Sequence, residues 1–251
     1  FTYTLERQRL YDLSLPAWYG GYQKVPALAS LTTRFWWDVR DRSFNATRGT
    51  RISYEFEISG GLLGGEYFPL SIFVLLASPY SYSLAQELAQ GAADFHLHIF
   101  EGIQYFHLAD KFIAVSRVKS GFVSGFKNYN KVPFTRLFWL GDIGPFGLRG
   151  YSFASIGPGR LFAILSQELR YRPSESFYLS VFADAGQTWK SWPKSNFTKP
   201  WLQSFKRSVG VGFRVEVPMM GVLGIDFAYG LDNPEGARWQ THFQFGIMGS
   251  Y

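Results

Sequence analysis

Cysteine is absent from this sequence of 251 residues, which excludes a disulfide framework and a thiolate metal site. Long apolar runs are also missing. The longest candidate, residues 68–77, is much shorter than the roughly 18 residues that a membrane-spanning helix requires. Basic tracts are missing too, because the lysines and arginines behind the net charge of +6 are scattered singly. Nucleic-acid binding is therefore not expected.

Aromatic residues, in contrast, are abundant. They make up 19% of the chain and hydrophobic residues 47%, yet the mean hydropathy is −0.06. Apolar side chains are therefore spread at alternate positions, which is typical of a transmembrane β-barrel. Phe1 stands inside such an alternating stretch with no charged and apolar leader ahead of it, so we expect a processed chain or a fragment.

Alternation of apolar and polar residues predicts ten strands separated alternately by short turns and long loops. We expect strands at residues 1–15, 31–40, 51–59, 94–106, 112–122, 161–171, 177–188, 205–217, 223–229 and 239–251. The polar faces carry charges of both signs, which suits a wet lumen better than a soluble core. The fold class predicted is all-β, a transmembrane antiparallel β-barrel.

Two places depart from the simple pattern near the start of the chain. Arg7 and Arg9 fall on the apolar face of the first strand, where each would cost roughly 2–4 kcal/mol at the bilayer midplane. We therefore expect a bulge or a register change there. Residues 60–93 break the alternation, and we interpret them as a long surface loop that holds a short helix.

The alternation also predicts which side chains face outward. In the strand at 94–106 the outward residues are expected to be Phe95, Leu97, Ile99, Ile103 and Tyr105. In the next strand, Arg117 and Lys119 are expected to face inward.

Residues 141–159 contain six glycines and two prolines, and their only basic residue is Arg149, flanked by Leu148 and Tyr151. Glycine costs backbone entropy in a regular element and proline cannot donate to a ladder, so this stretch is predicted to be a loop. It is far longer than a hairpin needs, and long loops often carry function.

Four motifs, taken in order, resemble the BamA superfamily of outer-membrane insertases and transporters. They are Trp37-Asp38-Val39-Arg40-Asp41 up to Gly49, Leu148-Arg149-Gly150-Tyr151, Phe182-Ala183-Asp184-Ala185-Gly186 followed by Trp189, and the C-terminal Phe243–Tyr251. Proteins of that family have a sixteen-stranded barrel preceded by POTRA domains. The resemblance implies that residues 1–251 are the C-terminal part of such a barrel, its last ten strands.

The resemblance also implies a loop latch, formed by Arg149, Gly150 and Tyr151 on the loop and by Asp184 and Glu168 on the barrel wall. Arg149 is expected to fold into the lumen and pair with a carboxylate, whose geometry suits its planar guanidinium. Both acidic residues have inward parity, and Asp184 is the preferred partner because it lies in the family motif. The alternative is that Asp184 is a solvated lumen charge with no partner.

At the C-terminus the family joins its last strand to its first at a lateral seam, where Phe243, Phe245, Gly246 and Tyr251 are the candidate residues. Gly246 weakens the strand, which favours opening of the seam, or it merely makes room for lumen packing. Tyr251 is part of an assembly signal or an interfacial aromatic anchor.

Other chemistries have little support in the sequence. His96 and His98 share one face, but no third metal ligand lies nearby, and no G-x-S-x-G motif of a serine hydrolase is present. No cofactor and no enzymatic activity are expected.

The functional hypothesis is an outer-membrane insertase whose partners are unfolded β-barrel substrates, outer-membrane lipid and accessory lipoproteins. The alternatives are a polypeptide transporter of two-partner secretion and the barrel anchor of a patatin-like esterase.

Overall fold

The structure, a computed structural model, describes residues 2–7, 27–60, 93–126, 132–191, 204–217, 221–233 and 239–246. Side chains are described from residue 30 onward. Several predictions lie outside these residues: the continuation of the first strand to residue 15, the side chains of Arg7 and Arg9, the loop and helix expected at 61–92, and Tyr251.

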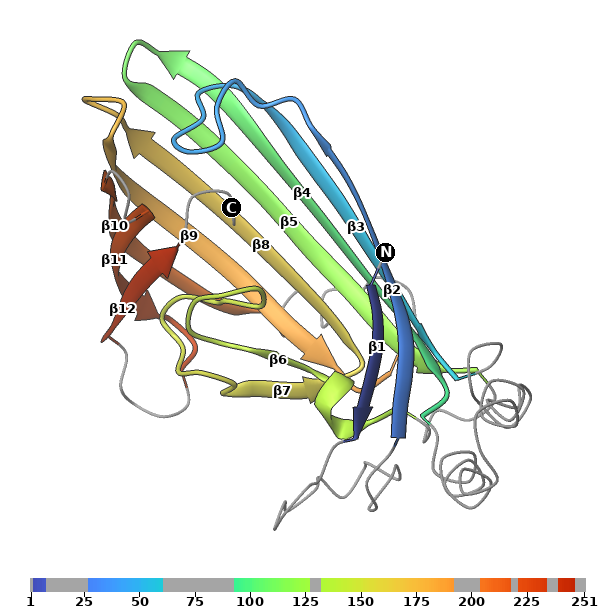
Figure 1. Cartoon of the computed structure of the whole chain (residues 1–251). Helices are drawn as coiled ribbons and strands as arrows, with labels where there is room; N and C mark the ends of the chain where they lie inside the picture. The colour runs from blue at the N-terminus through green and yellow to red at the C-terminus, as the bar shows by residue number, and fades with distance from the viewer. Residues whose placement is uncertain are drawn as a thin grey trace, which may run out of the picture. The chain divides into compact units, whose positions relative to one another are not determined.

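In the described part of the chain, ten strands form one sheet in the order β1-β2-β3-β4-β5-β8-β9-β10-β11-β12 (Figure 1). The strands are β1 (Thr2–Arg7), β2 (Ala27–Asp38), β3 (Gly49–Ser59), β4 (Phe95–Ala109), β5 (Phe112–Gly125), β8 (Leu161–Tyr171), β9 (Phe177–Trp189), β10 (Lys206–Val217), β11 (Gly221–Gly230) and β12 (Trp239–Gly246). The all-β fold class is confirmed. Short connections at 110–111 and 172–176 alternate with long ones at 126–160 and 190–205.

The chain divides into two compact units. One comprises residues 1–35, 54–99 and 121–137, and it contains the antiparallel pair β1–β2 and the short 3-10 helix η3 (Phe134–Arg136). The other comprises residues 36–53, 100–120 and 138–251, and all the motifs of the loop latch lie within it. Within the described ranges, no helix is long and apolar enough to cross a membrane.

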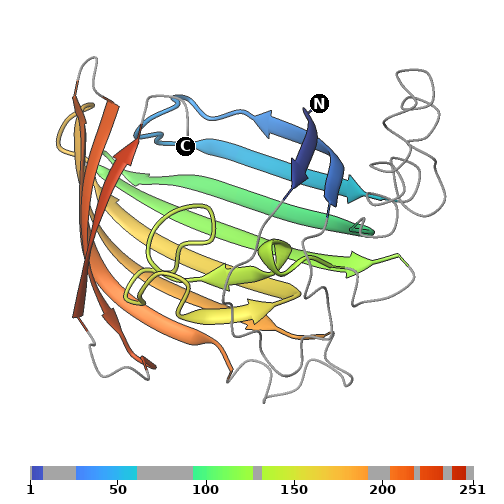
Figure 2. The same cartoon turned by 60° about the horizontal axis from the view of Figure 1, so that its bottom comes forward.

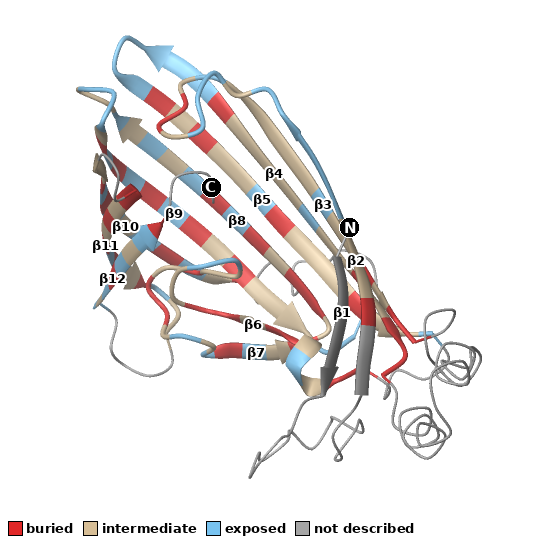
Figure 3. Ribbon diagram, in the orientation of Figure 1, coloured by how far each residue is buried: buried red, intermediate tan, exposed pale blue. Residues whose placement is uncertain are grey.

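Strands β8 to β12 show why this sequence forms a two-faced sheet. Each pairs antiparallel with the next in a continuous register. Apolar side chains at every second position are exposed, among them Leu165, Val181, Val211 and Phe243, whereas the residues between them are largely buried (Figure 3). The predicted alternation is confirmed for these strands.

The outward face predicted for β4 is wrong. Tyr105 is buried together with Ala46, Ile113 and Val115, and Ile103 packs against this cluster, whereas Phe106 is exposed. At this end of β4 the inward-facing Tyr105 and Ile103 pack with Ala46 of the β2–β3 turn, which covers this part of the face. Alternation locates two faces but not which of them is covered. Arg117 and Lys119 do face inward, toward the same cavity as Ile103.

The loop at 141–159 also contains more regular structure than predicted. Its last residues form β7 (Ile156–Gly159), which pairs antiparallel with β6 (Phe138–Leu140) in a separate two-stranded sheet. The proline is accommodated because this short strand has a single partner and a register irregularity. Figure 2 shows β6, β7 and the loop on the side around which β8–β12 curve.

Candidate functional site: an arginine loop held inside the sheet

The tip of the loop packs tightly on itself and on the sheet. Leu148 and Tyr151 have no exposed surface. The Asp142 amide donates to the Tyr151 carbonyl at 2.7 Å, and Asp142 forms an isolated β-bridge with Leu148. These contacts close the loop at its neck and bury two large side chains. Arg149, which lies between them in the sequence, is therefore also placed on the inner side of the sheet.

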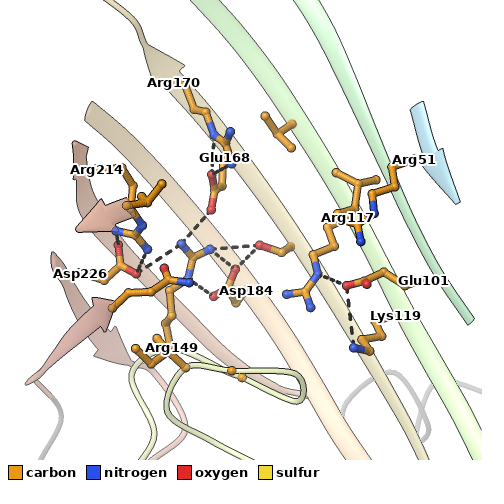
Figure 4. A pocket seen from close by; sticks show the side chains of 18 of the residues that line it. Arg51, Glu101, Arg117, Lys119, Arg149, Glu168, Arg170, Asp184, Arg214 and Asp226 are labelled. Atoms are coloured by element: carbon orange, nitrogen blue, oxygen red, sulfur yellow. Dashed lines mark hydrogen bonds and ion pairs between the residues drawn. The ribbon is translucent and has the colours of Figure 1, made fainter. Parts of the chain in front are cut away.

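Arg149 reaches carboxylates on two adjacent strands (Figure 4). Its Nε donates to Asp184 Oδ2 at 2.6 Å and its Nη2 to Asp184 Oδ1 at 2.7 Å, a bidentate pair. Its Nη1 donates to Glu168 Oε1 at 2.8 Å, and Nη2 also donates to Ser166 Oγ at 3.1 Å. The structure thus brings both predicted carboxylates to the arginine, Asp184 from β9 and Glu168 from β8.

Burial makes this arrangement costly to break. The Arg149 side chain is 11% exposed and that of Asp184 is 4% exposed. The guanidinium carbon lies 3.4 Å from the ring centroid of Phe182, which adds a cation–π contact. Burial alone would lower the pKa of Arg149, but the carboxylates of Asp184 and Glu168 outweigh it, so the pKa is raised above its usual value. The arginine is held as a cation.

Two further arginines continue the network along the wall. Arg170 Nε donates to Glu168 Oε2 at 2.8 Å, and Arg214 Nη1 donates to Asp226 Oδ1 at 2.8 Å. Asp226 Oδ2 also lies 3.9 Å from Arg149 Nη1. The three arginines and three carboxylates of this network line one cavity of about 440 Å³, whose wall also carries Arg40, Arg51, Arg117, Lys119, Glu101 and Asp142. Within the network, each buried charge has an opposite charge beside it that compensates it.

The two residues that follow Arg149 in the loop are held by separate hydrogen bonds. The Gly150 amide donates to His242 Nε2 at 2.9 Å, and the Tyr151 hydroxyl donates to the Arg207 carbonyl at 2.7 Å. The Asp232 amide in turn donates to the Tyr151 hydroxyl at 3.3 Å. The loop is therefore tied to β10, to β12 and to the segment that follows β11, as well as to β8 and β9.

Gly186, the last residue of the Phe182–Gly186 motif, has a packing role. A Cβ placed on it would lie 3.2 and 3.3 Å from the two terminal methyl carbons of Leu148 and 3.3 Å from Leu140 Cδ1. The glycine therefore leaves the space that Leu148 fills. Two of the four motifs, one on the loop and one on β9, are complementary at both Leu148 and Arg149.

The motif at Trp37–Gly49 builds the turn between β2 and β3. Arg40 pairs with Asp38 across 2.7 Å, from Nη2 to Oδ2. The Asp41 carboxylate accepts hydrogen bonds from the Thr47 amide at 2.9 Å and the Thr47 hydroxyl at 2.6 Å. The turn is thus held by local side-chain contacts. It also lines the same cavity as the latch through Arg40.

The candidate seam residues lie on β12, whose described hydrogen-bonded partner is β11. Phe243 and Phe245 are 71% and 69% exposed, and Gly246, opposite Val222, is buried. Tyr251 lies outside the described residues. The two phenylalanines and the glycine thus occupy opposite faces of the strand.

No role was predicted from the sequence for Asp142 or His242. His242 Nδ1 lies 2.6 Å from Asp142 Oδ1, and the His242 side chain is 3% exposed. The inward parity of His242 was visible in the sequence. Its contact was not, because the two residues lie far apart in the chain.

His96 and His98 contact each other rather than gathering ligands. His96 Nδ1 is 3.0 Å from His98 Nε2, and His98 stacks on Phe122 with ring centroids 4.5 Å apart. Among the described residues, no group of three His, Cys, Asp or Glu side chains is placed to hold a metal ion.

The fold and the site define a class of protein: an antiparallel membrane-barrel sheet whose long loop places an arginine against carboxylates on the wall. The model of the Omp85 superfamily domain matches residues 3–250. The chain belongs to the Omp85 superfamily, and the resemblance to the BamA superfamily seen in the sequence is confirmed.

A solved structure similar to this chain is BamA from Haemophilus ducreyi lacking POTRA domains 1–3. The two sequences are 18% identical, the match covers 88% of this chain and 42% of that chain, and the TM-score is 0.59. This likeness shows the fold. No curated protein sequence matches the chain.

Proposed function

We propose that the chain is the C-terminal barrel part of an outer-membrane insertase, which folds and inserts β-barrel proteins through a lateral seam. The observation that carries the proposal is the loop held inside the sheet by Arg149. A loop bonded to four strands, β8, β9, β10 and β12, and to the segment that follows β11 occupies the lumen beside β8–β12. This supports passage of a substrate at the edge of the sheet rather than through its interior.

The last strand supports the same proposal. β12 spans Trp239–Gly246, and β11 is its partner in the described sheet. Once the seam opens, the other edge of this strand would offer unpaired N–H and C=O groups to an incoming strand. Gly246 near its end lowers the cost of distorting it. Exchange of backbone hydrogen bonds is the chemistry proposed, with no cofactor, no covalent step and no enzymatic activity.

The complete barrel is proposed to have sixteen strands, of which this chain supplies the last ten, preceded by POTRA domains. The chain spans 42% of the length of the BamA chain that it matches, which supports the proposal. The partners proposed are unfolded outer-membrane barrels, the lipid of the outer membrane and accessory lipoproteins. The protein is proposed to be integral to the outer membrane.

A liposome assay tests the insertase. The full-length protein is reconstituted, and the appearance of protease-resistant, folded product from an unrelated unfolded outer-membrane barrel is followed against empty liposomes. We expect acceleration by the wild-type protein and its loss in Arg149→Ala. Arg42→Ala is the matched control. Arg42 lies between β2 and β3, is 43% exposed, and pairs with the exposed Glu175 between β8 and β9. This variant is expected to accelerate folding as the wild type does.

The alternatives give different results in the same liposomes. A two-partner secretion transporter would show ion conductance without accelerated folding, and that outcome would replace the insertase. The barrel anchor of an esterase would show neither, and the full-length protein would hydrolyse a short-chain ester.

A further inference from the structure

One buried imidazole joins the arginine loop to the last strand at two points. The Gly150 amide donates to His242 Nε2 at 2.9 Å, so Nε2 carries no proton. The proton therefore lies on Nδ1, which donates to Asp142 Oδ1 at 2.6 Å. Asp142 is at the neck of the loop and Gly150 is at its tip, next to Arg149. The neutral ring thus holds both parts of the loop on β12.

We propose that His242 is a positioning residue that holds the loop tip on β12 only while its imidazole is neutral, and that a second proton releases the tip. A doubly protonated ring donates at both nitrogens. Its Nε2–H would face the Gly150 N–H, two donors with no acceptor between them. The contact with Asp142 would persist as an ion pair. Protonation would therefore free Gly150 and leave the neck in place.

The charged groups around the ring permit this change. Asp142 faces it from the loop, and Asp226 of β11 is its cross-strand partner in the register. Asp226 is bonded to Arg214 of β10 and lies 3.9 Å from Arg149. No other residue of Trp239–Gly246 has a titratable side chain. A charged imidazole would thus meet a carboxylate directly, and the neighbouring arginines are already engaged with carboxylates.

A second contact between the loop and β12 supplies an internal reference. Gln240 Nε2 donates to Ser152 Oγ at 2.9 Å. Neither group titrates, so this contact is expected to be independent of pH. The release is then limited to the residues beside Gly150, and the loop is not expected to leave the sheet.

The consequence of release rests on the proposed function. If β12 is the strand that opens at the seam, the hydrogen bond from the loop tip to His242 stabilises this strand in its closed position. A second proton on His242 would remove that hydrogen bond, and the seam would open more readily in an acidic medium.

Hydrogen exchange measured by mass spectrometry tests the release on the full-length protein in liposomes. The wild type and His242→Gln are compared at the same pH, which cancels the intrinsic pH dependence of exchange. Glutamine is the conservative variant, because its amide oxygen can accept from Gly150 and does not titrate. At about pH 8 the peptide containing Gly150 is expected to exchange equally in both. At about pH 5 the wild type should exchange about five- to tenfold faster, as for one lost hydrogen bond.

His107→Gln is the matched control, since His107 is exposed on β4. This variant should keep the acid response, and His242→Phe should exchange fast at both pH values. Equal exchange of wild type and His242→Gln at acid pH overturns the proposal, as does loss of the response in His107→Gln. The liposome folding assay is run in parallel. If no variant accelerates folding but the exchange response is present, the proposed function fails and the role of His242 stands.

Discussion

Two arginines of this chain fold toward the same cavity, and they are held in different ways. Arg40, in the β2–β3 turn, meets the carboxylate of Asp38, two residues away. Arg149, in the long loop, meets Glu168 and Asp184, which are 19 and 35 residues away. The first pair forms as soon as the turn forms. The second requires the loop and two strands to be assembled.

The difference lies also in what remains if the arginine is removed. The Asp38 side chain is 31% exposed, so water can solvate it without a partner. The Asp184 side chain is 4% exposed and would be left charged in a dry site. A local, partly wet pair contributes little to stability, whereas breaking a buried, long-range pair is strongly destabilising. The turn motif shapes the chain, and the loop motif joins distant parts of it.

The largest expected effect is on the buried pair. Asp184→Ala should lower the free energy of unfolding by about 3–5 kcal/mol, because it removes the bidentate carboxylate partner of the buried Arg149 cation. Arg40→Ala should cost less, because water can solvate the Asp38 side chain that it leaves, which is 31% exposed. Urea unfolding of the purified barrel in detergent measures both.

The double variant Arg149→Ala, Asp184→Ala tests whether the two residues act as one unit. It should be no less stable than the worse single variant, because each single change already breaks the pair. Additive losses would show that the bidentate contact does not couple them.

A smaller effect, about 1–3 kcal/mol, is expected from adding a methyl group at either motif glycine. Gly186→Ala would place its Cβ 3.2 Å from a Leu148 methyl carbon, a side-chain obstacle. Gly49→Ala would meet the Val39 carbonyl at a φ of +109°, a backbone obstacle. Leu148→Val should therefore restore part of the stability lost in Gly186→Ala.

The same Leu148→Val change should do nothing for Gly49→Ala, and thermal melting in detergent compares the four variants. Rescue of both glycine variants, or of neither, would contradict the distinction between a packing limit in the loop and a conformational limit in the turn.

The sequence was sufficient for the strands, since each exposed apolar face repeats at every second residue. It failed at β4, where Tyr105 and Ile103 lie under the β2–β3 turn. An inner face that is covered by a turn is as apolar as an outer face in lipid. Periodicity alone cannot tell the two apart, because it carries no information on what lies opposite.

For the candidate site, the sequence placed Arg149, Glu168 and Asp184 on surfaces that can meet, since loop and parity fix their sides. It did not predict the contact of His242 with Asp142 or the ion pair of Arg214 with Asp226. Those contacts depend on how far the loop folds in and on the register between strands. Both are set by packing, such as that of Leu148 against Gly186, and cannot be predicted from a single sequence.

The smallest expected effect tests the turn alone. Burial raises the pKa of Asp41, but the hydrogen bonds from Thr47 and from the Arg48 amide outweigh it, so the pKa is lowered overall. A lowered pKa in the folded state stabilises the fold above the unfolded value of about 3.9, and this contribution is lost as the pH falls through the folded value. The difference in stability between wild type and Asp41→Asn should therefore be below about 1 kcal/mol at neutral pH and smaller near pH 3. Urea unfolding of both proteins at the two pH values measures it. A difference that grows on acidification would mean that the carboxyl group is held in its protonated form, and that the turn is stabilised by something other than its ionised aspartate.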